Sequence, residues 1–153
     1  DGFIRSGSSD QGLEVLQKML EATPSRNVPY TRVVLPVVEL LAGLAEDPQL
    51  SDAQKAEAAA LAKEVGTELF TQLADDMDYF IRLDDERYFA SDQSIQVAMA
   101  VTQRISGALE DALPEDEQVQ AVVARLKQIR KDNSDRQRGQ FAESPVFDPD
   151  AQP

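Results

Sequence analysis

The chain contains no cysteine and no histidine. Without cysteine it has no disulfide and no thiolate nucleophile, and without histidine it has no imidazole base. The usual ligands of zinc and haem are missing as well. Because the chain lacks every nucleophile–base pair built on His or Cys, the catalytic alternative is a carboxylate-based hydrolase or a metal-dependent enzyme. We therefore expect a protein that is not an enzyme and that holds no cofactor.

Basic residues are scarce, since 15 Lys and Arg stand against 28 Asp and Glu and give a formal net charge of −13. Such a surface repels phosphate backbones and anionic lipid headgroups, so nucleic acid is excluded as a partner.

Long apolar runs are also missing. The densest one, Val33 to Ala45, is shorter than the roughly 18 residues that cross a bilayer, and it contains Glu39. We expect no direct membrane insertion and identify no small-molecule substrate.

What the chain does have suits one domain: 153 residues, of which 42% are hydrophobic and 28% are charged. It starts at Asp1 rather than at Met, which indicates processing or trimming of the N-terminus. A targeting segment removed in that way would leave no trace here, so its absence does not assign a compartment.

Apolar residues recur with the 3.6-residue period of helices rather than the two-residue period of strands. The second predicted helix is apolar over more than half of its circumference, so we expect it to be the most buried. Short connections favour antiparallel neighbours, and the chain therefore predicts an all-α, up-down bundle of four to five helices within residues 9–131. The predicted helices are 9–22, 31–45 (bent near Pro36), 52–83, 91–113 and 114–131, the last with Pro114 at its first position.

Both ends of the chain lack this periodicity. Residues 1–8 form a polar N-terminal arm, and residues 132–153 are predicted to be an extended or partner-ordered tail. Apolar groups on otherwise polar segments are common in pieces that order on a partner, although such segments also fold back over a bundle. The groups in question are Phe3, Ile4, Phe141, Val146 and Phe147.

The stretch from Asp75 to Phe89, DDMDYFIRLDDERYF, raises the question of a metal or acid–base site. It has no glycine for a calcium-loop turn, and there is no histidine for a bundle di-metal site. At 100° per residue, Asp75 and Asp78 fall opposite the apolar stripe of their helix, whereas Asp76 falls within its arc. Asp78 can pair with Arg82. We interpret the stretch as a solvated helix end and expect no tight metal site.

Two groups of residues are candidates for partner binding. Arg87, Tyr88 and Phe89 lie in a predicted loop, where they either form a docking patch or cover the bundle end. Basic residues also gather late in the chain, where they either offset a helix dipole or form a positive patch for an acidic partner; they are Arg125, Lys127, Arg130, Lys131, Arg136 and Arg138. The partner-binding residues we predict are Phe3, Ile4, Arg87, Tyr88, Phe89, Arg136, Arg138, Phe141 and Phe147.

Residues 61–78, LAKEVGTELFTQLADDMD, resemble the long third helix of the PsbQ-like extrinsic proteins of photosystem II. The Leu69-Phe70 pair, the spaced Leu73 and the acids Asp75 and Asp78 carry the resemblance, which extends over about Asp52 to Leu113. It implies a four-helix up-down bundle on the lumenal side of a thylakoid membrane, without catalysis or cofactor. Such a subunit would help retain calcium and chloride at the oxygen-evolving centre. The helix after Pro114 and the acidic tail depart from the family pattern.

The function expected from these observations is that of a non-catalytic extrinsic subunit of a membrane protein complex. In its narrower form, this is a PsbQ-like subunit of the thylakoid lumen that stabilises the oxygen-evolving centre of photosystem II. Its partners would be other protein subunits of that complex. The alternative is a helical adaptor or inhibitor module of the bacterial periplasm or cell envelope.

Overall fold

The computed structural model describes residues 9–22, 29–82 and 89–143, and every regular element within them is a helix. This confirms the predicted all-α class. None of these helices is both long and apolar enough to cross a membrane. The elements are α2 (Ser9–Ala22), α3 (Pro29–Ala45), α4 (Asp52–Arg82), α5 (Phe89–Ala112) and α6 (Glu117–Glu143).

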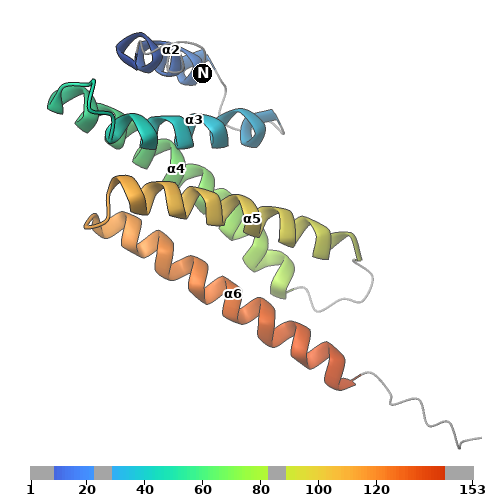
Figure 1. Cartoon of the computed structure of the whole chain (residues 1–153). Coiled ribbons are helices and arrows are strands. Elements are labelled where there is room, and N and C mark those ends of the chain that lie inside the picture. The colour runs from blue at the N-terminus through green and yellow to red at the C-terminus, as the bar shows by residue number, and fades with distance from the viewer. Residues whose placement is uncertain (1–8, 23–28, 83–88, 144–153) are drawn as a thin grey trace, which may run out of the picture.

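The centre of the bundle is the pair formed by α4 and α5. Helix α3 packs against both on one side, and α6 packs against both on the opposite side (Figure 1). Consecutive helices from α3 to α6 run in alternating directions, as the short connections predict (Figure 1). Helix α2 covers the outer side of α3. As a result, one long face of α5 lies open between α3 and α6.

Helix α3 is the most buried, as its apolar circumference predicts. Seven of the twelve residues from Val34 to Ala45 are buried, a larger share than among the described residues of any other helix. Leu41 is fully enclosed. The chain continues as a helix through Pro36, which lies on the exposed side. Water can therefore reach the backbone carbonyl that proline leaves without its usual amide partner.

The three inner helices approach each other closely at Gly66 of α4. A methyl group at this position would lie 3.2 Å from side-chain carbons of Leu109 on α5 and Val38 on α3. Phe70, one turn later, is 1% exposed, as expected for a core aromatic. The predicted stripe of α4 faces this core, with Phe80 outside the described side chains; its members are Ala58, Leu61, Ala62, Val65, Leu69, Leu73 and Met77.

Side-chain caps fix where two of the helices begin. Ser51 and Gln54 form a reciprocal capping box on α4, in which the amide of each residue donates to the side chain of the other. Asp116 caps α6 by accepting the amides of Gln118 and Val119 at 3.0 and 3.2 Å. Helix α6 therefore begins at Glu117, and the prediction that Pro114 opens it is wrong, because the carboxylate cap lies two residues later.

Two further boundaries differ from the predictions. Phe89, predicted in a loop, is the first residue of α5. Residues 132–143, predicted to be extended, continue α6 to Glu143. Two residues hold this segment against the bundle, although its weak periodicity does not indicate them. Asn133 is buried and accepts a hydrogen bond from Arg136 at 3.1 Å. Five of its other ten residues are Gln, Arg or Asp, whose side chains are readily solvated and allow the helix to extend beyond the core.

Candidate functional site

The described part of the acidic stretch is a link between two helices. Asp75 and Asp78 of α4 both accept hydrogen bonds from the guanidinium of Arg125 on α6, at 2.6 and 3.1 Å. The hydrogen bond that Arg125 donates to Asp75 is the main cause that raises the pKa of Arg125. Asp76 is exposed, because Ala74 and Met77 turn inward instead. These carboxylates thus hold α6 against α4.

A metal site of the kind considered for this stretch requires several carboxylates that converge. Among residues 9–22, 29–82 and 89–143, no three acidic side chains come together in such a group. Asp84, Asp85 and Glu86 lie outside the described residues, as do the side chain of Arg82 and its predicted pairing with Asp78.

The late basic residues divide into two sets on α6. Arg125, Arg130 and Arg136 face neighbouring side chains: Arg125 bonds Asp75 and Asp78, Arg130 donates to Gln103 of α5, and Arg136 donates to Asn133. Lys127, Lys131 and Arg138 are exposed instead, and they form no hydrogen bond or ion pair with any side chain that the structure describes.

These three exposed cations share one side of the helix. Positions 127, 131 and 138 are spaced by four and seven residues, which places them within about 40° of each other around the axis. They extend over roughly 16 Å along it. We refer to Lys127, Lys131 and Arg138 as the cationic strip.

The structure places only some of the predicted partner-binding residues. Arg138 belongs to the cationic strip, whereas Arg136 is half-buried and helps to anchor the end of α6. Phe89 and Phe141 lie on α5 and α6, with side chains outside the described set. Phe3, Ile4, Arg87, Tyr88 and Phe147 lie outside the described residues. The predictions for those side chains remain predictions.

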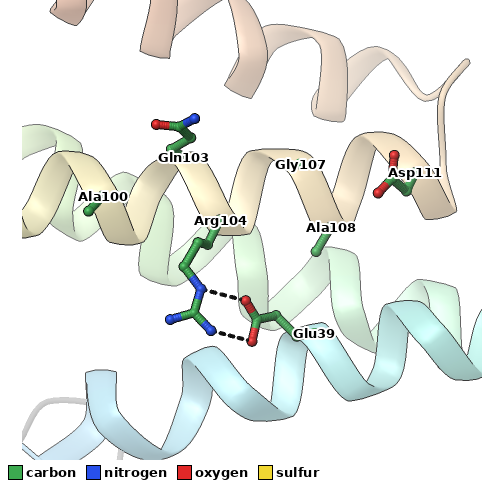
Figure 2. A pocket seen from close by; sticks show the side chains of 7 residues that line it. All are labelled: Glu39, Ala100, Gln103, Arg104, Gly107, Ala108 and Asp111. Carbon is green, nitrogen blue, oxygen red and sulfur yellow. Dashed lines mark hydrogen bonds and ion pairs between the residues drawn. The ribbon is translucent and has the colours of Figure 1, made fainter.

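A second surface feature is a shallow, open hollow of about 600 Å³ on the free face of α5 (Figure 2). We refer to it as the α5 hollow. Ala100, Gly107 and Ala108 contribute no long side chain, so they form its floor. Longer side chains stand around them, with Glu39 contributed by α3; these are Gln103, Arg104, Asp111 and Glu39.

One edge of the α5 hollow is a two-point ion pair between helices. The Nε and Nη2 groups of Arg104 donate to the two carboxylate oxygens of Glu39, both at 2.7 Å (Figure 2). The remaining nitrogen, Nη1, forms no hydrogen bond with any described residue. The carboxylate of Asp111 is likewise without a hydrogen-bond partner in the described part of the chain. Among its charged side chains, the hollow therefore offers one unused donor group, Nη1 of Arg104, and one unused acceptor group, the carboxylate of Asp111.

The α5 hollow was not predicted from the sequence. A signal was present, because Glu39 is the one charge within the apolar run from Val33 to Ala45, and a charge in that position needs a partner on a neighbouring helix. The spacing of Ala100, Ala108 and the 65% exposed Val97 on one side of α5 was a second signal. Neither signal identifies Arg104 as the partner, because the two residues are 65 positions apart.

No family model, no curated protein and no solved structure matches this chain. Its function is therefore inferred from the side chains that it presents. The cationic strip and the α5 hollow both offer polar groups with unused bonding capacity on convex or shallow surfaces, an arrangement that fits another macromolecule.

Proposed function

We propose that this protein is a non-catalytic subunit that binds an acidic protein surface through the cationic strip of α6. One observation carries the proposal: Lys127, Lys131 and Arg138 are exposed on one side of a helix without an ion-pair partner among the described residues. The chain has 28 acidic residues for 15 basic ones, so acidic partners for ion pairs within the chain are plentiful. Three basic side chains that remain free together are available to a partner.

The charge distribution supports a fixed orientation toward that partner. Helix α6 contains six basic and four acidic residues, a net charge of +2, within a chain whose net charge is −13. The exposed side of α4 carries Glu57, Glu64 and Glu68 instead. An acidic partner would repel the α4 side and attract the α6 side, so complementary potentials would both guide the encounter and select the docking face.

The narrower form of the proposal is a PsbQ-like subunit of the thylakoid lumen that stabilises the oxygen-evolving centre of photosystem II. The resemblance of residues 61–78 to that family supports it, and the alternating directions of α3 to α6 agree with the bundle that the family has (Figure 1). The partners would then be acidic surfaces of other subunits, and no cofactor of its own would be required.

The broad proposal is tested with the triple variant Lys127→Gln, Lys131→Gln, Arg138→Gln. A control with the same change in net charge places three negative charges on other exposed positions: Gln49→Glu, Gln96→Glu, Gln118→Glu. On an immobilised polyglutamate column, the triple variant should elute at clearly lower salt than the control. Equal elution of the two variants would reject the cationic strip as the docking surface.

The narrow proposal needs its own test. Photosystem II particles stripped of extrinsic subunits are incubated with the wild-type protein, and co-sedimentation and oxygen evolution at low calcium and chloride are measured. The wild type should bind and raise oxygen evolution, and the triple variant should bind at least about tenfold more weakly. Retention on polyglutamate without binding to the particles would reject photosystem II as the partner and leave the broad proposal in place.

A further inference from the structure

The α5 hollow contains two side chains of opposite charge that keep unused bonding capacity, Arg104 beside its pair with Glu39 and Asp111. Arg104 offers Nη1 on one side of Gly107, and Asp111 offers its carboxylate on the other side. The two residues are seven positions apart, close to two full helical turns, so they share a face but lie roughly 10 Å from each other along the axis. That separation prevents them from neutralising each other within one chain.

The same spacing makes the face complementary to itself. When two copies of one helix cross in antiparallel orientation about a two-fold axis, each position faces the position at equal distance on the other side of the axis. The midpoint between Arg104 and Asp111 falls between Gly107 and Ala108. An axis at that point sets Arg104 of each copy opposite Asp111 of the other and therefore forms two identical ion pairs.

We propose that the α5 hollow is the contact surface between two copies of this chain, with antiparallel α5 helices that cross at Gly107 and Ala108. The shape agrees with the charge pattern at that point. The crossing would occur where the side chains are smallest, which lets two backbones approach closely. No atom lies within 4 Å of where a side chain at Gly107 would begin, so this space is empty in a single copy.

A second copy fits this face better than an unrelated acidic or basic partner does. A uniformly acidic partner would be repelled by Asp111 and a uniformly basic one by Arg104, whereas Asp111 of a second copy would meet the unused Nη1 of Arg104, on the side of the guanidinium away from Glu39. A self-complementary pair satisfies both free groups at once. The contact is small and partly polar, so we expect a weak dimer with a Kd that is roughly micromolar or higher.

Charge reversal tests the proposed pairing directly. Asp111→Lys places a lysine opposite Arg104 in the dimer and should raise the dimer Kd at least about tenfold in sedimentation equilibrium. Glu110→Lys, the same change at the exposed neighbouring position, should leave the Kd unchanged. Arg104→Glu alone should also weaken the dimer. An equimolar mixture of the Asp111→Lys and Arg104→Glu chains should associate again, because each reversed charge then meets its opposite.

A cross-link gives a second test that does not depend on charge. The chain has no cysteine, so Gly107→Cys introduces a single thiol close to the proposed two-fold axis. Mild oxidation should join two Gly107→Cys chains much faster than two Ala60→Cys chains, whose exposed thiol lies on α4, because a disulfide needs Cα atoms within about 7 Å. A wild-type chain that stays monomeric up to about millimolar concentration would overturn the proposal. Equal weakening by Asp111→Lys and Glu110→Lys would overturn it as well.

Discussion

A methyl group added at Gly66 tests the closest approach of α3, α4 and α5. In Gly66→Ala the new carbon would lie 3.2 Å from both terminal methyls of Leu109 and 3.2 Å from a methyl of Val38. Carbon atoms prefer separations of about 3.5–4.0 Å, so each neighbour has to retreat by a few tenths of an ångström. Leu109 and Val38 are both fully buried and cannot turn toward solvent.

Two opposing effects set the change in the free energy of unfolding that Gly66→Ala causes. Replacing glycine by alanine within a helix favours folding by about 1 kcal/mol, whereas crowding a well-packed core costs about 1–3 kcal/mol. We therefore expect Gly66→Ala to lower the free energy of unfolding by up to about 2 kcal/mol. Gly43→Ala is the matched control, since Gly43 is exposed on α3 with no atom within 4 Å. The control should be stabilised by up to about 1 kcal/mol.

Thermal and urea unfolding followed by far-UV circular dichroism would measure both variants. With about 2–4 °C per kcal/mol for a chain of this size, their melting temperatures should separate by several degrees. The cost of Gly66→Ala should also shrink in a Val38→Ala background, where space has been created beside the new methyl. If Gly66→Ala stabilises the protein as much as Gly43→Ala does, the close packing described at this point is wrong.

Leu41→Ala should lower the free energy of unfolding by about 2–5 kcal/mol, and the same change at the partly buried Leu40 should cost clearly less; equal losses in urea titrations would contradict the burial of Leu41. Arg125→Ala should destabilise by roughly 1 kcal/mol at low salt and by less at 1 M NaCl, since its pairs with α4 are partly exposed; a loss that salt does not change would argue against an electrostatic link. The hydrogen bond from Lys63, followed by the amides at the start of α6, lowers the pKa of Asp116, so its contribution to stability is present above its ordinary pKa of about 3.9 and is lost as the pH falls through the lowered value. Asp116→Asn should therefore lose less stability than the wild type between about pH 4 and pH 2, and parallel acid-unfolding curves would refute this.

Periodicity alone was enough to predict the helices that have an apolar stripe. Helix α3 is apolar on most sides, and a chain of that pattern has to be covered on most sides, which is why its burial could be predicted. The start of α4 was also visible, because Ser51 and Gln54 have the spacing of a capping box. The end of α6 could not be predicted from the sequence. Beyond Asp132 the buried residue is Asn133, and a single polar residue gives no periodic signal.

The amino-acid sequence by itself determined the fold class, the acidic surface and the lack of thiol and imidazole chemistry, because composition and local periodicity fix these without knowledge of which helices meet. The tertiary structure alone decided which charges are used internally. Arg125 is paired with Asp75 and Asp78 because the packing of α6 on α4 brings together residues about 50 positions apart, and Arg104 is paired with Glu39 for the same reason. Lys127, Lys131 and Arg138 stay free because the side of α6 that carries them faces away from both neighbouring helices, and no pattern along the chain distinguishes a paired cation from a free one.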